Sequence, residues 1–127
     1  MSLRDDVVLR VVHQLIEALL RAAGLRRKKD LPAAEQALGD GLGAMGLPLQ
    51  LVASVDADTL ASLVPDPTRR ALLSAVLAEL AELREAQGRA AEAEALRARA
   101  VSLADALDAA ALAEPVREVL ERARIPW

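Results

Sequence analysis

Five basic side chains lie close together in the first quarter of the sequence. Arg26, Arg27, Lys28 and Lys29 are consecutive, and Arg21 precedes them by one to two helical turns. Such a cluster can hold a phosphate group, a nucleic acid or another acidic partner. The same residues fall at the end of a predicted helix, where positive charge complements the negative end of the helix dipole. We favour this second interpretation and keep an anionic ligand, bound through residues 21–29, as the alternative.

Residues 41–46, GLGAMG, match the G-x-G-x-x-G pattern by which dinucleotide-binding proteins hold a pyrophosphate against the start of a helix. That function needs a strand before the glycines and a helix after them. Here a helical pattern precedes the glycines, and Pro48 would disturb a helix that followed. We therefore interpret the motif as the glycine-rich end of a helix and expect no cofactor.

Few residues are suited to catalysis or metal binding. The sequence has one histidine, His13, and no cysteine, so a metal site would need carboxylates around that histidine. Glu17 follows one turn later, which is typical of a partly exposed ion pair. Glu79, Glu82 and Glu85 are expected to face water, whereas a general acid–base pair needs a carboxylate desolvated in a cleft. We expect no catalytic or metal-binding residues and a protein that is not an enzyme.

Trp127, at the last position, is the only aromatic residue. It has two interpretations. The indole can fold back and cap the core, or it can stay exposed and anchor a partner, because tryptophan is a frequent interface hot spot.

The composition predicts helices. Among 127 residues there are 28 Ala and 24 Leu, both strong helix formers, and neither Phe nor Tyr. The net charge of −3 divides into +4 over residues 1–29 and −7 over the rest, which disfavours general nucleic-acid affinity. We see no signal peptide, membrane span or domain boundary, and expect one cytoplasmic all-α domain over residues 1–127.

Apolar residues recurring every three and four positions, together with Pro, Gly and capping residues, divide the chain into about five to six helices before a short last one. The predicted ranges are residues 3–28, 31–45, 48–55, 57–64, 67–87 and 89–113, with a last short helix after Glu114-Pro115. The range 48–55 is short enough to be a strand instead, but nothing else in the chain would pair with a strand. Gly88 is expected to end its helix in a left-handed conformation.

The segment 77–104, with the core AELREAQGRAAEAEALRARAVSLA, resembles one tetratricopeptide repeat, a helix-turn-helix unit of about 34 residues. Gly88 stands at the turn, but Arg84 and Arg97 occupy positions where the family usually has aromatic residues. Residues 19–42 are similar to a degenerate second copy, and small uncharacterised bacterial proteins share such a core. The resemblance implies antiparallel helical hairpins and a binding face with Ala75, Ala78, Glu82 and Glu85.

These observations predict a non-catalytic module for protein–protein interaction, an adaptor or scaffold. Its partner would be another protein or a second copy of the chain in a homodimer, since repeat hairpins usually need about three copies to bury a continuous core. Neither nucleic acid nor a membrane is the expected partner. The candidate partner-binding residues are Glu82, Glu85, Trp127, Arg21, Arg26, Arg27, Lys28 and Lys29.

Overall fold

The computed structural model describes residues 3–105, and over this range it confirms the all-α class and the helical hairpins. The range holds six helices, and the segment 48–55 contributes one of them. Their bounds are α1 Leu3–Arg27, α2 Leu31–Gly43, α3 Leu49–Ser54, α4 Ala57–Leu63, α5 Pro67–Ala86 and α6 Ala90–Asp105. The helix predicted after Glu114-Pro115 and the indole of Trp127 lie outside the described residues. That residues 1–127 form one domain stays a prediction.

Local capping chemistry sets the helix ends. Asp30, Asp56 and Asp66 each precede a helix, and each carboxylate accepts a hydrogen bond from the backbone N–H three residues later. A proline in the first turn of α2 and α5 has no N–H whose hydrogen bond would be lost. Gly88 has a φ of 78° and joins α5 to α6, as expected for a left-handed residue after a helix.

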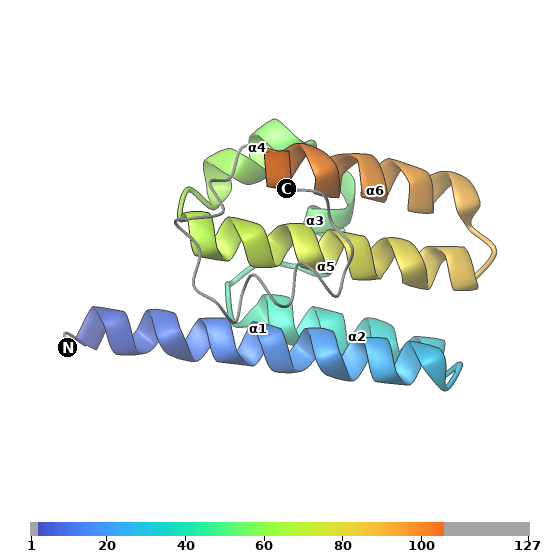
Figure 1. Ribbon diagram of the computed structural model, residues 1–127, viewed down its shortest axis with the longest axis horizontal. Helices are drawn as coiled ribbons and strands as arrows, with labels where there is room; N and C mark the ends of the chain where they lie inside the picture. Colours follow the sequence, from blue (N-terminus) through green and yellow to red (C-terminus); the bar gives the residue numbers. More distant parts are fainter. Residues whose placement is uncertain (1–2, 106–127) are drawn as a thin grey trace.

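The helices form two antiparallel hairpins (Figure 1). In the first hairpin α1 packs along α2, and in the second α5 packs along α6. The hairpins meet through α5, which contacts both α1 and α2. The short helices α3 and α4 connect α2 to α5, and α4 packs on α6. Helix α5 is therefore the central element.

The core is made of leucine, valine and alanine side chains. All six helices contribute large, fully buried side chains, and Leu15, Leu38, Leu72, Leu80 and Leu103 are among them. Among residues 10–105, whose side-chain burial the structure describes, Leu20 and Leu63 are the large apolar side chains that are exposed. Between Leu3 and Asp105 no helix combines the length and the apolar character that crossing a bilayer requires.

Arginine side chains fix the short connecting helices. The Arg99 guanidinium, on α6, donates to the carbonyl oxygens of Val52 and Val55 at 3.5 and 2.9 Å. Arg70, at the start of α5, donates to the carbonyls of Ala61 and Val64. Since the last carbonyls of a helix have no partner within the helix, these bonds satisfy the ends of α3 and α4.

Candidate functional site

The basic cluster is divided by an ion pair that the sequence did not reveal. Arg26 Nε lies 2.7 Å from Glu79 Oε1, and Arg26 Nη2 lies 3.4 Å from Glu79 Oε2, so α1 is joined to α5. The two side chains are only 22% and 11% exposed. The hydrogen bond to Glu79 raises the pKa of the Arg26 guanidinium above its usual value. Arg26 therefore serves the hairpin contact, and the expectation that Glu79 faces water was wrong.

The other four basic residues point to different places. Arg27, Lys28 and Lys29 are exposed at the turn between α1 and α2, where Lys29 has a φ of 65°. Arg21 lines a groove between α1 and α2. The five residues thus do not form one continuous basic surface. An anionic ligand bound through this segment would find only the three residues at the turn grouped together.

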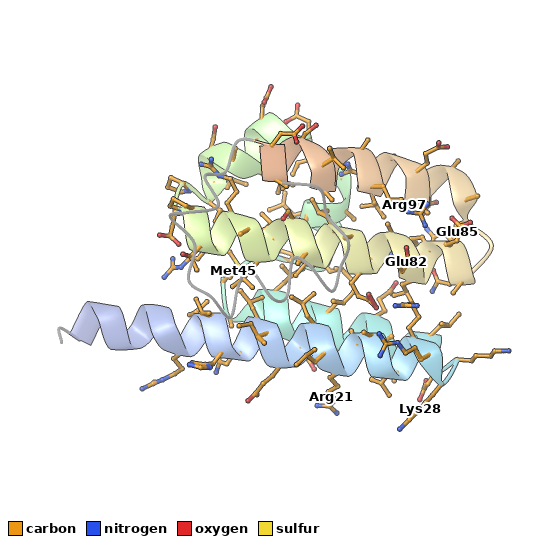
Figure 2. All side chains as sticks on the ribbon, viewed as in Figure 1. Arg21, Lys28, Met45, Glu82, Glu85 and Arg97 are labelled. Atoms are coloured by element: carbon orange, nitrogen blue, oxygen red, sulfur yellow. The ribbon has the colours of Figure 1, made fainter. Side chains whose placement is uncertain are left out.

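Glu82 and Glu85 lie on α5 and face Arg97 of α6 (Figure 2). Arg97 Nη2 is 3.4 Å from Glu82 Oε1, and Arg97 Nη1 is 3.3 Å from Glu85 Oε2. All three side chains are about half exposed, so the network is open to water and its pairs add little stability. The two carboxylates predicted to bind a partner are already shared with one guanidinium.

Arg84, a departure from the repeat pattern, connects three helices. Its guanidinium, only 11% exposed, pairs with Glu35 of α2 and lies 3.7 Å from Glu92 Oε2 of α6. Nη1 also donates to Gln87 Oε1 at 2.9 Å. The Arg84 side chain thus joins the two hairpins, with its stem packed and its head paired.

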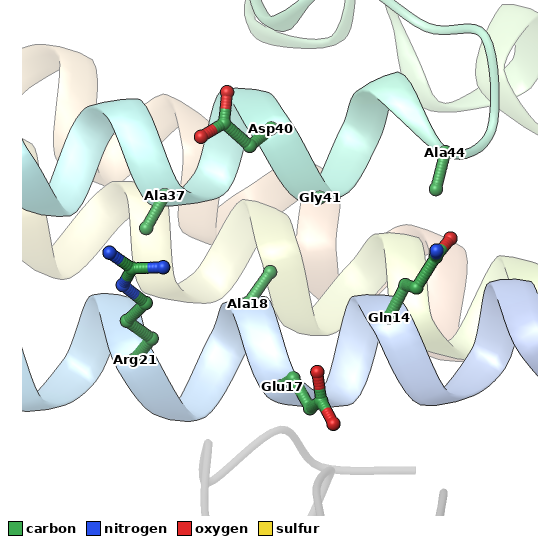
Figure 3. Close-up of a pocket in the computed structure, with 8 residues that line it drawn as sticks. All are labelled: Gln14, Glu17, Ala18, Arg21, Ala37, Asp40, Gly41 and Ala44. Carbon is green, nitrogen blue, oxygen red and sulfur yellow. The ribbon is translucent and has the colours of Figure 1, made fainter.

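A groove of about 410 Å³ runs between α1 and α2 (Figure 3). Its floor consists of small residues and its rim is polar. The floor is formed by Ala18, Ala37, Gly41 and Ala44, and the rim by Gln14, Glu17, Arg21 and Asp40. Figure 3 shows Arg21 and Gln14 extending from α1 towards α2, near Ala37 and Ala44 respectively, while Glu17 points away from α2.

The two helices approach closely at this floor, where Gly41 faces Ala18. A Cβ placed on Gly41 would lie 2.5 Å from the Cβ of Ala18, so only glycine fits at position 41. Gly41, the first glycine of the motif at 41–46, therefore has a packing role, and it lies inside helix α2 and does not follow a strand. Sequence reasoning missed the groove, although small residues recur at positions 37, 41 and 44 of α2 and at 18 of α1.

His13 and Glu17 lie one helical turn apart on α1, and the expected ion pair between these two described side chains is not formed. His13 and Glu17 are both exposed on α1. Over the described residues no three His, Asp or Glu side chains are grouped so that they could hold a metal ion.

No protein-family model, curated protein or solved structure matches the chain. The resemblance to the tetratricopeptide repeat thus rests on the residues quoted for it.

Proposed function

We propose that this protein is a non-catalytic protein-interaction module and that the groove between α1 and α2 is its partner surface. The observation that carries the proposal is the groove itself: a floor of small side chains, about 410 Å³ in volume, bordered by polar and charged groups. Interfaces combine such a close-packed centre with a polar rim. An adaptor or scaffold needs a surface of this kind and no reacting groups.

The shape of the floor favours a helix as the bound element. Gln14 and Arg21 mark the two ends of the groove and are seven residues apart on α1, which corresponds to about two helical turns, or roughly 10 Å. Small residues let a third helix approach the backbones of α1 and α2 closely. We therefore expect a two-turn helical segment with small side chains on its buried side.

The charges on the rim specify the chemistry of that segment. Within the described range no ion pair joins Arg21 to another side chain, and this side chain extends across the groove towards α2 (Figure 3). Asp40 already accepts a hydrogen bond of 3.0 Å from the Gln36 amide. An acidic side chain of the partner, placed at the Arg21 end, would form a charge-assisted hydrogen bond there.

The exposure of the carboxylates supports binding over catalysis. Glu17 and Asp40, the two acidic groups at the groove, are exposed to solvent. The pKa of a general acid or base is usually shifted by desolvation in a cleft, and neither side chain has that environment.

The packing of α5 on both helices of the first hairpin also agrees with the arrangement that the repeat resemblance implies. The cytoplasm remains the compartment that we expect, because the chain has no cysteine.

Affinity capture with matched variants tests the proposal. The bait is the full chain, used unchanged or with Arg21→Glu or Ala44→Arg, which inverts the charge at one end of the groove or fills the other. The controls are Arg89→Glu and Ala98→Arg, exposed positions on and beside α6. We expect a protein partner that resists nuclease and is lost from both groove variants but retained by both controls.

Other outcomes would contradict the groove assignment. Equal recovery with groove and control variants would place the partner surface elsewhere. Capture of material that nuclease removes would favour the alternative function, in which residues 27–29 bind nucleic acid or another anionic ligand. Recovery of the bait alone, with light scattering showing a dimer that Arg21→Glu dissociates, would identify a second copy as the occupant of the groove.

A further inference from the structure

The described helices form two bodies that the backbone joins at one point. The first hairpin, α1 and α2, is one body and covers residues 3–43. The second body, α3 to α6, covers residues 49–105. Arg99 of α6 bonds the carbonyls at the end of α3, and Arg70 of α5 bonds those at the end of α4, so both short helices are fixed to the second hairpin. The backbone crosses between the bodies at residues 44–48.

The backbone hydrogen bonds of this crossing segment stop at the boundary between the bodies. The N–H groups of residues 44–47 donate back to the carbonyls of residues 41–43, at the end of α2. The carbonyl of Pro48 accepts in the other direction, from the N–H of Val52 in α3. Rotation about the backbone of Leu47 therefore breaks none of these bonds. A few residues of this kind are sufficient for a hinge between two rigid bodies.

Two ion pairs join the bodies at the opposite end of α2. Among the described residues, Arg26–Glu79 and Glu35–Arg84 are the side-chain hydrogen bonds and ion pairs that cross from the first hairpin to the second body. We call these two pairs the latch. Figure 1 shows the α1–α2 turn and the α5–α6 turn at one end of the molecule. Helix α2 leads from there to the hinge over 13 residues, or about 20 Å.

Apolar side chains of α5 lie between the hinge and the latch. Glu79 faces α1 and Arg84 faces α2, so the arc of α5 between these two directions faces the first hairpin. At about 100° per residue, Val76, Leu80 and Leu83 fall within this arc, and all three are buried. Separation of the bodies would expose them to water, so the closed form is the stable one.

The contact between the bodies is weaker than the contacts inside them. Helix α5 packs more extensively on α6, and α1 on α2, than α5 packs on α1 and α2 together. Units of a protein that share few contacts open at a lower free energy than the units themselves unfold. Each hairpin should therefore stay intact when the two bodies separate.

The two pairs of the latch are not equivalent. Arg84 would keep Glu92 and Gln87 as neighbours if Glu35 lost its charge. Arg26 bonds to Glu79 through two nitrogens, and among the described residues it has no second carboxylate within ion-pair distance. Since this guanidinium is mostly buried, loss of the charge on Glu79 leaves it without compensation. Glu79 is thus the decisive residue of the latch.

We infer that the first hairpin swings as one body about Leu47 and that the latch keeps it closed. Opening uncovers the apolar side of α5 that faces the first hairpin, and the ion pairs of the latch determine how often this happens. The α1–α2 groove lies within the first hairpin and moves with it unchanged. The inference is therefore independent of the proposed function.

Thiol reactivity tests the motion, because the chain has no cysteine of its own. One full-length variant carries Val76→Cys, on the side of α5 that faces the first hairpin. The matched variant carries Ala100→Cys, equally buried inside the second body, one turn after Arg97, which faces α5. We expect the thiol at position 76 to react at least about tenfold faster. Urea should accelerate it less steeply than the thiol at position 100, because opening exposes less surface than unfolding does.

Charge variants in the Val76→Cys background test the latch. Glu79→Gln removes the charge with little change of shape and should accelerate the reaction roughly tenfold. The control, Glu85→Gln, removes a half-exposed carboxylate that pairs within the second body, and the rate should stay within about threefold. Exchanging the charges, with Arg26→Glu and Glu79→Arg together, remakes the pair and should return the rate towards that of the unchanged latch.

Three results would overturn the inference. If the thiols at positions 76 and 100 react at the same rate with the same urea dependence, the two bodies unfold as one unit. If Glu79→Gln leaves the rate at position 76 unchanged, the ion pair is not a latch. If the charge exchange reacts as fast as Glu79→Gln alone, the side chains act by packing and not by their charges.

Discussion

Replacing Gly41 with alanine sets two effects of known size against each other. Inside a helix the change from glycine to alanine is favourable by up to about 1 kcal/mol. At Gly41, however, the new methyl would lie 2.5 Å from the Cβ of Ala18, and ordinary carbon contacts are about 3.5–4.0 Å. Neither Cβ can rotate away, so α1 and α2 must separate by about 1 Å. Overpacking of this kind costs roughly 1–3 kcal/mol, and we expect a net loss of up to about 2 kcal/mol.

The same helix supplies a control for helix propensity. A Cβ on Gly39 meets no atom within 4 Å, so Gly39→Ala should stabilise the protein by about 0.5–1 kcal/mol. Urea unfolding followed by circular dichroism gives both values. Combining Gly41→Ala with Ala18→Gly moves the methyl across the contact and should make the double variant more stable than additivity predicts, by about 1–3 kcal/mol. If Gly41→Ala stabilises as much as Gly39→Ala, the close approach of α1 to α2 is wrong.

Three further predictions concern side chains that hold the helices. Glu79→Ala should lower the free energy of unfolding by about 1–3 kcal/mol, because Arg26 is left mostly buried without its partner. Arg84→Ala should lower the free energy of unfolding by a similar amount, whereas Arg89→Ala, which removes a half-exposed ion pair, should change it by no more than about 0.5 kcal/mol. Urea unfolding of both variants checks this. The hydrogen bonds that the Asp56 carboxylate accepts from Thr59 lower the pKa of this residue. The ionised carboxylate therefore stabilises the folded protein above the ordinary Asp pKa of about 3.9, and this stabilisation is lost as the pH falls through the pKa of the folded state. Thermal melts should therefore show a difference between Asp56→Ala and the unchanged chain at pH 7 that shrinks at pH 3.

Features set by neighbours in the sequence were predictable. The capping residues Asp56 and Asp66, the first-turn prolines and the left-handed Gly88 each act within four residues, and the starts of α2, α4 and α5 and the end of α5 follow from them. The short helix α3 was also assigned correctly, by the absence of any pairing strand.

Features that depend on distant residues were not predictable in the same way. Glu79 has the spacing of a solvated face, but 53 residues separate it from the arginine that it pairs with. Arg84 is likewise paired with Glu35, 49 residues away. Helical periodicity specifies which side of a helix is apolar, and it does not specify which charged residue borders a contact.

The candidate site also depends on contacts between residues that are far apart in the sequence. The basic residues were grouped by their adjacency in the sequence, whereas the helix directs Arg21 and Arg26 to different sides of α1. The groove arises where two helices cross at Ala18 and Gly41, a contact that needs both partners to be known.

Chemical-shift mapping tests the central claim most directly, and a chain of 13.5 kDa is well suited to it. The captured partner, or a peptide from it, is added to the isotope-labelled chain, and the backbone amide shifts are followed. The proposal predicts that the perturbed amides gather in residues 14–21 and 37–44, on the two sides of the groove. Perturbations confined to residues 27–29, or to residues 82–97 on α5 and α6, would contradict it.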